Sequence, residues 1–590
     1  MAPTAVHVER GSTGSPGKPR ILVPEKVSPD GLSMLTSDFE VDLRPGLSAD
    51  ELLDSISSYH GLIVRSETKV TAQILAAGTK LRVVARAGVG VDNIDVDAAT
   101  AQGIIVVNSP SGNIVAAAEH TVALLLATAR HIGRADRTFK EGRWERGKLV
   151  GVEVGHKTLG IIGLGKVGMK VARMCVGLGM KVVAVDPYAS ADLARQANVE
   201  LVPTLEEVLP MVDFLTIHTP LLASTLDLLG EKELKKMKKT ARVLNVARGG
   251  VYNEAALLKA LDEGWIAGAG LDVFTKEPPE EGSVAAQLAK HPKVVATPHL
   301  GASTVEAQEN VSLDVCGQVL LILKGGLPTS AVNAPLILPE EYRKLQPFVK
   351  LVEKMGGLYT QHYVGAKGKM LGGRKFELVY QGDLASITNT RPLFAALVKG
   401  LVSTISDSGG RDVNIVNANL IAKEKGLVIN EMHTHETSDS QTFASLVTLR
   451  SVDKDKRSEQ VIEGYVSGNT VYISKLDKFT ASFTPEGTLL ILHNYDEPGK
   501  IGGVGTALGK HGINIRFMTV ASLESEGEAV MGDLTRVDSA VAGVDPAAAL
   551  NGKGGDEALM ILGVNGVVGK AVVEDLKTAE GILDVSLVQL

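Results

Sequence analysis

The fold is decided by the stretch Thr158-Leu-Gly-Ile-Ile-Gly-Leu-Gly-Lys-Val-Gly168. Its apolar first part, Leu159 to Ile162, predicts a buried strand of a parallel sheet. The strand leads directly into Gly163-x-Gly165-x-x-Gly168, and a helical pattern follows from Lys170 to Leu178. A strand, a glycine-rich turn and a helix in this order are typical of a mononucleotide-binding unit.

Each glycine of this turn has a physical role in holding a dinucleotide. Gly163 allows the tight turn, Gly165 lets the backbone approach a pyrophosphate, and Gly168 lets helix and strand pack closely. The helix N-terminus offers N–H groups and a positive dipole end to the phosphates. A second apolar run ends in Asp186, whose carboxylate can accept hydrogen bonds from a ribose diol. We therefore predict a dinucleotide site here.

Bulk properties bound the protein class. At 590 residues the chain is too long for one core, which predicts three or four domains. A net charge of −7 indicates no general attraction to nucleic acid or membrane, and no apolar run is long enough to span a bilayer. Cys175 and Cys316 cannot form a disulfide framework and are expected to be buried packing residues in a reducing compartment.

The first eighteen residues are rich in Gly, Pro, Ser and Thr, and we predict a disordered tail. They lack the apolar segment of a signal peptide and are too broken by Pro and Gly for an amphipathic mitochondrial presequence. A cytoplasmic protein is the expectation.

From Arg20 to about residue 332, short apolar runs alternate with helical stretches, as in βα units around a parallel sheet. Two longer helices are predicted at Asn113–Ile132 and Val305–Leu323. We predict an α/β fold with two Rossmann-like, doubly wound parallel-sheet domains, one inserted in the other. The expected strands are Ile21–Pro24, Leu62–Val64, Val83–Ala85, Ile104–Val107, Phe214–His218, Val243–Val246, Ala269–Val273 and Val294–Ala296.

Two smaller domains are expected after the linker-like Asn333–Pro339. The first has strand-like segments at Phe376–Gln381, Val428–His433, Thr442–Leu449 and Tyr465–Ile473. The second has the order βαββαβ from Thr488 to Val588, with a long acidic excursion, Ser525 to Asp556, where a hairpin would be short. His433 and His435 could suggest a metal pair, but no third ligand has convincing spacing, so we predict no metal site.

Three motifs follow predicted strands and carry the side chains of an alcohol-oxidising site. They are Asn245-Val-Ala-Arg-Gly-Gly250, Leu271-Asp-Val-Phe-Thr-Lys-Glu-Pro-Pro279 and Thr297-Pro-His-Leu-Gly-Ala-Ser303. Ligands of open α/β sheets bind at the carboxyl ends of strands, so these motifs point to one crevice. An arginine can fork onto a substrate carboxylate, and a histidine can take a hydroxyl proton while a neighbouring Glu fixes its tautomer.

These motifs, together with GLGKVG and the strand-terminal Asp186, resemble the D-isomer-specific 2-hydroxyacid dehydrogenases. Within that family, VRSETKVT, ARAGVGVDNID, NSPSGN and GRWERGK are similar to the long-form D-3-phosphoglycerate dehydrogenases over roughly Arg20 to Val332. The two C-terminal domains resemble the intervening (ASB-like) domain, of α+β type, and the ACT regulatory domain of the long form. The implied domains are a tail (1–18), a substrate-binding domain (19–118 and 301–332), an NAD-binding Rossmann domain (119–300), an intervening domain (333–484) and an ACT domain (485–590).

The resemblance implies a set of site residues. The implied catalytic residues are Arg248, Glu277 and His299, with His299 as proton donor and acceptor. The implied cofactor is NAD, which supplies the hydride chemistry and would contact Val89, Gly163, Gly165, Lys166, Val167, Gly168, Asp186, Thr219, Val246, Ala247, Arg248, Asp272, His299, Gly301 and Ala302. The implied substrate contacts are Arg65, Arg86, Ser111, Gly112, Asn113 and, across a dimer interface, Arg146. Several arginines suit a phosphate and a carboxylate on one small molecule.

The family's amino-acid effector site falls on Asn494, Asp496 and Asn514. Asp496 can pair with an α-ammonium, and the amides can reach a carboxylate or hydroxyl. Glu67 departs from the family pattern, because a small neutral residue is expected beside Arg65; the acid could weaken substrate binding or simply face solvent.

The resulting prediction is NAD-dependent oxidation of 3-phospho-D-glycerate to 3-phosphohydroxypyruvate, the first step of L-serine synthesis. A homo-oligomer, most simply a tetramer, and L-serine as a possible effector are expected. Lys235-Lys-Met-Lys-Lys239 is interpreted as a solvated helix face rather than a nucleic-acid patch. Two alternatives stay open: another 2-hydroxyacid dehydrogenase, such as a glyoxylate/hydroxypyruvate reductase, and a non-catalytic NAD-sensing corepressor on the same fold.

Overall fold

The structure is a computed structural model that describes residues 18–364, 371, 374–406, 413–434, 444–452, 460–522 and 557–590. The chain folds into two compact units, one mainly of residues up to 332 and one mainly of residues 333–590. The predicted tail, apart from Lys18, and the predicted excursion Ser525–Asp556 lie outside the described residues, as does His435.

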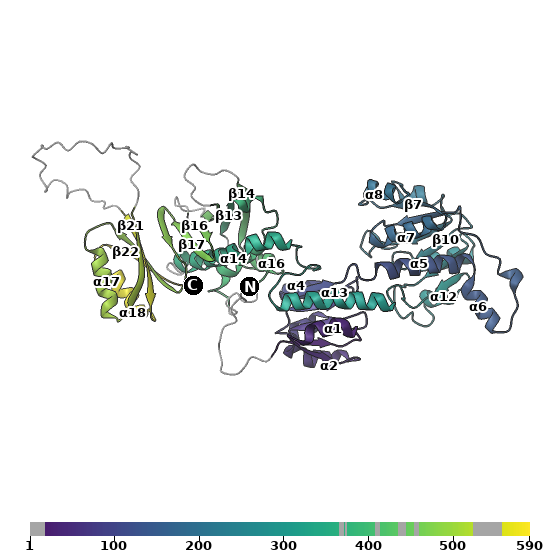
Figure 1. The fold of residues 1–590 in the computed structure, drawn as a ribbon, viewed down its shortest axis with the longest axis horizontal. Helices are drawn as coiled ribbons and strands as arrows, with labels where there is room; N and C mark the ends of the chain where they lie inside the picture. The colour runs from purple at the N-terminus through teal and green to yellow at the C-terminus, as the bar shows by residue number, and fades with distance from the viewer. Residues whose placement is uncertain are drawn as a thin grey trace, which may run out of the picture. The chain divides into compact units, whose positions relative to one another are not determined.

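The first unit holds two α/β sheets (Figure 1). The smaller has five strands in the order β2-β1-β3-β4-β5. These strands are β1 (Arg20–Val23), β2 (Glu40–Leu43), β3 (Gly61–Val64), β4 (Val83–Arg86) and β5 (Ile105–Asn108). They are short apolar segments, and β3 is buried along its whole length, as expected of a strand covered on both faces. Its helices are α1 (Pro29–Thr36), α2 (Ala49–Ser55), η1 (Ile56–Ser58), α3 (Ala72–Ala77) and α4 (Val96–Ala101).

The larger sheet of this unit is parallel throughout and positions the glycine-rich turn. Its seven strands run in the order β12-β11-β10-β9-β6-β7-β8. They are β6 (Thr158–Ile162), β7 (Lys181–Val185), β8 (Val199–Leu201), β9 (Phe214–Ile217), β10 (Arg242–Asn245), β11 (Gly268–Leu271) and β12 (Val294–Ala296). The chain order reverses between β6 and β9, which makes their carboxyl ends the switch point where such sheets bind ligands.

Helical segments flank the larger sheet. They are α5 (Ile114–Ala129), α6 (Ile132–Lys140), η2 (Arg146–Lys148), α7 (Lys166–Gly177), α8 (Ala191–Gln196), α9 (Leu205–Val208), α10 (Glu231–Leu234), α11 (Glu254–Asp262) and α12 (Val284–Lys290). The long helix α13 (Val305–Leu323) packs instead against α1, β3 and β4 of the smaller sheet. Cys175 in α7 and Cys316 in α13 are both fully buried, and burial raises the pKa of each thiol to about 12, which confirms them as unreactive packing residues.

The second unit contains a six-stranded mixed sheet and a four-stranded antiparallel sheet. The mixed sheet, in the order β14-β13-β15-β16-β17-β18, is made of β13 (Lys375–Gly382), β14 (Val428–Thr434), β15 (Ser445–Val452), β16 (Gln460–Ser467), β17 (Thr470–Leu476) and β18 (Phe479–Phe483). Its helical segments are α14 (Pro339–Tyr359), a π-helical turn η3 (Thr360–Val364), η5 (Asp383–Ser386), α15 (Arg391–Val402) and α16 (Ala418–Glu424).

The four-stranded sheet has the predicted βαββαβ element order and the strand order β20-β21-β19-β22. Its elements are β19 (Thr488–Tyr495), α17 (Lys500–Lys510), β20 (Asn514–Ser522), β21 (Glu557–Asn565), α18 (Lys570–Lys577) and β22 (Ile582–Gln589). Leu490 and Leu492 pack in a core with residues of α17 and α18, whereas Leu489 and Ile491 join the core of the mixed sheet. The antiparallel sheet is therefore covered on both faces.

The predicted mixed α/β fold class is confirmed, with three differences in detail. The helix predicted over Asn113–Ile132 ends at Ala129, because His131 adopts a left-handed φ of 54° before the separate helix α6 begins at Ile132. The predicted single strand Tyr465–Ile473 is a hairpin of β16 and β17 that turns at Gly468, where φ is 60°. Helix α7 begins at Lys166, four residues earlier than predicted, because Gly168 hides its first turn in the sequence.

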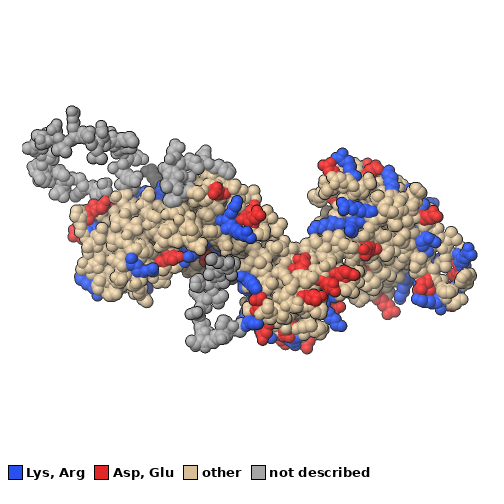
Figure 2. Space-filling view, viewed as in Figure 1, with Lys and Arg blue, Asp and Glu red and all other residues tan. Residues whose placement is uncertain are grey.

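Charge on the surface is mixed in sign. On the face drawn in Figure 2, blue and red side chains are interspersed over the first unit. Lys235 pairs with Glu231, Lys236 with Glu206 and Lys238 with Asp213. The run Lys235–Lys239 follows α10 instead of lying on a helix, so the predicted helix face is wrong in its secondary structure. Among the described residues, no helix is both long and apolar enough to cross a membrane.

Candidate active site

The glycine-rich turn lies at the carboxyl end of β6. Gly163 has a φ of 90°, and a Cβ there would come within 2.8 Å of the His218 carbonyl oxygen at the end of β9. A Cβ on Gly168 would run into the carbonyl oxygen of Gly163. By contrast, a Cβ on Gly165 would meet no protein atom within 4 Å. Two glycines are thus required by packing, and the third opens the start of α7 to a ligand.

Polar groups around this turn fit a dinucleotide. Asp186 Oδ2 accepts from the backbone N–H of Leu164 (2.7 Å) and Oδ1 from that of Tyr188 (2.8 Å), which fixes the carboxylate beside the turn. The Thr219 hydroxyl at the end of β9 is buried without a hydrogen-bond partner among the described residues. A buried orphan hydroxyl at the switch point is a group that a bound ligand can satisfy.

The other predicted cofactor residues lie on neighbouring loops of the first unit. Lys166 begins α7 and donates from Nζ to Ser111 Oγ (2.8 Å). Val89 is partly exposed after β4. The others occupy the first turn of α7 (Val167), the loop after β10 (Val246, Ala247) and the loop after β12 (Gly301, Ala302).

His299 and Glu277 form a direct pair beside the sheet edge. His299 Nδ1 lies 2.6 Å from Glu277 Oε2, and Glu277 Oε1 accepts from the Phe274 N–H (3.0 Å). Burial raises the pKa of the Glu277 carboxyl, but the hydrogen bonds from His299 and Phe274 outweigh it, and the net pKa is below the usual value. An ionised Glu277 accepts the Nδ1 proton, so Nε2 of His299 is the nitrogen left for proton exchange.

Asp272 holds the loop that carries His299. Burial alone would raise the pKa of this fully buried carboxyl, but hydrogen bonds bring it below the usual value. Its oxygens accept from the Thr297 hydroxyl (2.5 Å), the Leu300 N–H (2.7 Å) and the Gly301 N–H (2.8 Å). His120 Nε2 of α5 lies 3.1 Å from Asp272 Oδ1. Neither His120 nor Thr297 was predicted as a partner of Asp272. Thr297 lies in one of the quoted motifs, whereas His120 lies in an apolar helix and no sequence motif marks it.

Arg248 is held by the loop after β10. The buried Asn245 accepts from the Ala247 N–H (2.9 Å) and donates to the Arg248 carbonyl (2.7 Å). The guanidinium Nε lies 3.3 Å from Asp92 Oδ2, a partner that the sequence did not single out. Arg248 is thereby directed toward the loop after β4, the strand that ends at Arg86.

Arg65 follows β3, and Arg86 is the last residue of β4. The buried Glu25 carboxylate accepts from the N–H groups of Arg65 (2.8 Å), Glu67 (3.2 Å) and Thr68 (3.0 Å), which shapes the Arg65 loop. The Glu67 side chain itself is exposed, in agreement with the expectation that it faces solvent. Burial first, and then the like charge of Arg248, lowers the pKa of Arg86 to about 10. Arg86 and Arg248 thus place two positive charges close together, where a bound anion would be stabilised.

Ser111, Gly112 and Asn113 form the loop before α5, and a Cβ on Gly112 would press against Val311 of α13. Arg146 lies apart from this group, exposed at the start of η2 beside the exposed Trp144. The structure does not bring Arg146 to the other arginines within one chain.

The predicted effector residues are also not brought together within one chain. Asn494 is paired with Ala558 at one end of β21, and Asn514 with Asn565 at the other. Seven residues of strand separate them by roughly 23 Å. Asn494 is buried, with its Oδ1 lacking a hydrogen-bond partner among the described residues, whereas Asp496 and Asn514 are exposed.

Comparisons with known proteins agree with this geometry. Residues 122–301 match the family model for the D-isomer specific 2-hydroxyacid dehydrogenase NAD binding domain, and residues 344–472 match that for the D-3-phosphoglycerate dehydrogenase intervening domain. The chain is 42% identical to D-3-phosphoglycerate dehydrogenase 2, chloroplastic, of Arabidopsis thaliana, over 87% of this chain and 82% of that protein. It is 38% identical to D-3-phosphoglycerate dehydrogenase of Archaeoglobus fulgidus, over 97% of this chain and all of that protein.

A solved structure from Polaromonas sp. JS6 66, assigned to the D-isomer specific 2-hydroxyacid dehydrogenases, has the same fold, with a TM-score of 0.50 and 24% identity over 53% of this chain and 99% of that chain. The family model and the Rossmann-like sheet make NAD the cofactor. The chain belongs to the D-3-phosphoglycerate dehydrogenase family of the D-isomer-specific 2-hydroxyacid dehydrogenases.

Proposed function

We propose that this protein oxidises 3-phospho-D-glycerate to 3-phosphohydroxypyruvate with NAD, the first step of L-serine biosynthesis. The observation that carries the proposal is the His299–Glu277 pair (2.6 Å). The two residues lie on the loops after β12 and β11, which neighbour β10 and the loop that carries Arg248, at the same carboxyl edge of the parallel sheet as the glycine-rich turn. Relatives that share 38–42% identity over most of the chain are named for this reaction. Bound NAD would accept the hydride, and the side chains supply the rest of the chemistry.

His299 is the base of the reaction. Its Nδ1–H is held by Glu277, so Nε2 takes the proton from the C2 hydroxyl and returns it in the reverse direction. Arg248 forks onto the carboxylate next to C2 and stabilises charge on the C2 oxygen. Asp272 is a positioning residue, because it ties the N–H groups of Leu300 and Gly301 to one buried carboxylate.

The phosphate is bound by the upstream arginines. Arg65 follows β3 and Arg86 ends the neighbouring β4, and burial together with the charge of Arg248 lowers the pKa of the partly buried Arg86. A dianionic phosphate with a nearby carboxylate would compensate these positive charges. Arg146 reaches this group only from a second chain, since within its own chain it lies on the exposed α6–η2 segment.

The defining experiment is a steady-state assay with NAD and 3-phospho-D-glycerate. Turnover that is abolished by His299→Ala, while NADH still binds, supports the proposal and excludes a non-catalytic NAD sensor. Comparison with unphosphorylated D-glycerate decides between this reaction and that of a glyoxylate/hydroxypyruvate reductase. Equal kcat/KM for the two acids would refute the phosphate assignment.

We further propose that the βαββαβ domain is an ACT domain that binds L-serine between two chains. Asn494 and Asn514 lie at opposite ends of β21, so a site that uses both needs a second copy of the sheet. Pairing of two βαββαβ domains, together with dimerisation through the nucleotide domains, would give a tetramer. We also propose a cytoplasmic location. Calorimetry with L-serine tests this: binding to the intact protein that is lost in Asn494→Ala is expected, and absence of any heat contradicts it.

A further inference from the structure

Strand β19 places a histidine in an apolar row. Alternate residues of the strand face opposite sides of the sheet, and Leu489 and Ile491 belong to the core of the mixed sheet. His493 continues this row, and its ring packs edge-on against Phe479 of β18, with centroids 5.7 Å apart. At the third position of this row, where the pattern predicts an apolar residue, the strand carries the imidazole of His493, a type of side chain that can bind metals.

Two other segments bring ligand-type side chains to the same place. His362 lies in the π-helical turn η3, is 6% exposed, and its ring stacks parallel to that of His493 at 6.1 Å. Asp477 begins the tight turn between β17 and β18, where it holds a left-handed φ of 53°. π-Helical turns are frequent at functional sites, and left-handed non-glycine residues are uncommon.

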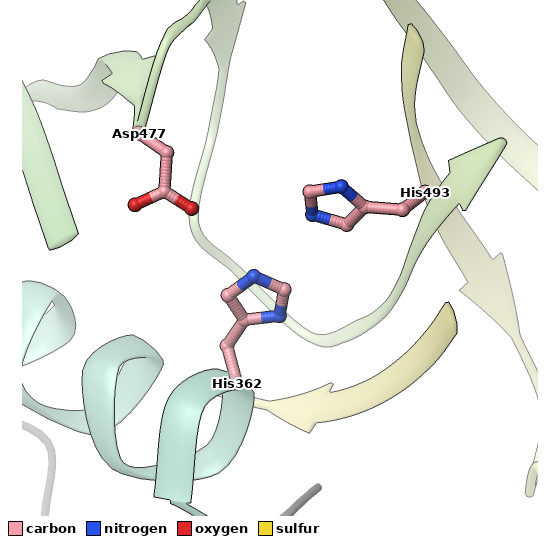
Figure 3. Close-up of side chains that lie close together, drawn as sticks. All are labelled: His362, Asp477 and His493. Carbon is pink, nitrogen blue, oxygen red and sulfur yellow. The ribbon is translucent and has the colours of Figure 1, made fainter. Parts of the chain in front are cut away.

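Figure 3 shows the three side chains converging from a helical turn, a hairpin and a strand. One ligand atom from each of His362, Asp477 and His493 lies within 4.8 Å of the others. We propose that these three residues form a binding site for one Zn²⁺ ion, which would join the intervening domain to the βαββαβ domain. The sequence predicted no metal here, because the ligands from η3 and from β19 are more than a hundred residues apart in the chain.

The donor set selects the class of ion. Two imidazoles and one carboxylate suit Zn²⁺ and related transition ions, whereas Mg²⁺ and Ca²⁺ take oxygen ligands. Tetrahedral ligands about 2.1 Å from an ion are roughly 3.4 Å apart, so the widest pair must close by at most about 1.4 Å. Three protein ligands leave the fourth position for water or an exogenous ligand.

The surroundings support the ligands. Asp477 Oδ1 accepts from the Tyr363 hydroxyl (2.6 Å) and the Val461 N–H (3.2 Å), and these two hydrogen bonds orient the carboxylate.

The test uses the full-length protein, stripped with a chelator and titrated with Co²⁺ and then Zn²⁺. One Co²⁺ per chain with the intense visible absorption of a four-coordinate site is expected, displaced by stoichiometric Zn²⁺ and not by Mg²⁺. His493→Gln and Asp477→Asn should each weaken Zn²⁺ binding by more than about 100-fold, and Tyr363→Phe, which only orients Asp477, by roughly 10- to 100-fold.

The matched control is His511→Gln. His511 pairs with Asp575 at 3.1 Å on the helical face of the same domain, and it belongs to no three-ligand group among the described residues. It should bind Zn²⁺ as the wild type does. Two measurements separate loss of the site from misfolding. His493→Gln should retain dehydrogenase activity, and Zn²⁺ should raise the melting temperature of the wild type and of His511→Gln but not that of His493→Gln. Zn²⁺ affinity unchanged in both His493→Gln and Asp477→Asn, or no tight Co²⁺ or Zn²⁺ binding to the wild type, would overturn the proposal.

Discussion

His299 Nδ1 lies 2.6 Å from Glu277 Oε2, and Glu277 is itself fixed by the Phe274 N–H. The pair sets which imidazole nitrogen carries a proton. In Glu277→Gln the amide no longer offers a charged acceptor, so we expect kcat to fall by about 100-fold or more with little change in NADH affinity. Steady-state kinetics and NADH fluorescence titration measure the two effects.

Glu280→Gln is the matched control, since Glu280 lies three residues along the same loop and pairs only with the exposed Lys276 among its described neighbours. It should retain full activity. A Glu277→Gln enzyme as fast as Glu280→Gln would mean that the carboxylate does not support the base.

Asp272→Asn should destabilise the protein in a pH-dependent way. The buried carboxylate accepts from Thr297, Leu300 and Gly301, and an amide cannot accept all of these bonds, so we expect a loss of about 1–3 kcal/mol near neutral pH. The pKa of Asp272 lies below its ordinary 3.8 in the folded state, so its stabilisation is complete above that value and disappears as the pH falls through the lower folded pKa.

Denaturation of wild type and variant from pH 3 to 7 checks the Asp272 prediction. Asp262→Asn, which removes an exposed partner of His291, should cost less than about 1 kcal/mol. A constant difference between Asp272→Asn and wild type across the acid range would contradict the assigned pKa direction.

Gly165 and Gly168 should respond oppositely to the same substitution. A Cβ on Gly165 meets open space, so Gly165→Ala is expected to fold with an unchanged melting temperature but to bind NADH more weakly. A Cβ on Gly168 meets the Gly163 carbonyl, so Gly168→Ala should lower the melting temperature by several degrees. Thermal scans with and without NADH distinguish the two, and equal melting temperatures would contradict the packing role of Gly168.

Arg146 should act across a chain interface. We expect Arg146→Ala to lower kcat/KM for the phosphorylated acid and His299→Ala to be inactive. When the two variants are co-expressed in equal amounts, half of the dimers are hybrids with one complete site of two, so activity at low substrate should return to about a quarter of wild type. Activity no higher than that of Arg146→Ala alone, diluted by half, would place Arg146 in its own chain's site or outside it.

His218 should make stability fall on mild acidification. Burial lowers its pKa to about 4 from an ordinary value of 6.5, so between these values the unfolded chain binds a proton that the folded chain does not. The cost reaches at most about 3 kcal/mol near pH 4. His218→Gln, whose terminal amide lies near the position of the imidazole Nε2 that contacts the Thr216 hydroxyl, should flatten the decline, as denaturation at pH 4 to 7 would reveal. Parallel wild-type and variant curves would argue against a buried neutral histidine.

Much of the first unit could be predicted, because its signals are local. Strand β12 and helix α13 occupy the predicted residues, and the glycine-rich turn and the His299, Glu277 and Arg248 motifs each lie on one contiguous stretch. Contacts between segments that are far apart in the chain could not be predicted. His120 reaches Asp272 across more than a hundred residues, and Asp92 meets Arg248 across a similar span. Neither pairing leaves a pattern in the sequence.

The second unit was less predictable, because its architecture depends on the order in which its strands pair. A βαββαβ order does not say that β21 lies between β19 and β20. Both strands are antiparallel to β21, so Asn494 near the end of β19 and Asn514 at the start of β20 lie at opposite edges of the sheet. The Gly468 turn inside an alternating stretch likewise hid a hairpin. His433, considered as a metal ligand, instead packs on Tyr380.

The shared core of the second unit has a consequence for protein engineering. Leu489, Ile491 and Val588 pack among residues of the mixed sheet, so a chain cut before β19 would expose an apolar face on each fragment. Deleting the C-terminal domain would therefore change solubility before it changed regulation. Single substitutions of the proposed metal-binding or effector-binding residues leave this shared core intact. They can therefore test what the C-terminal domain binds without the aggregation that truncation would cause.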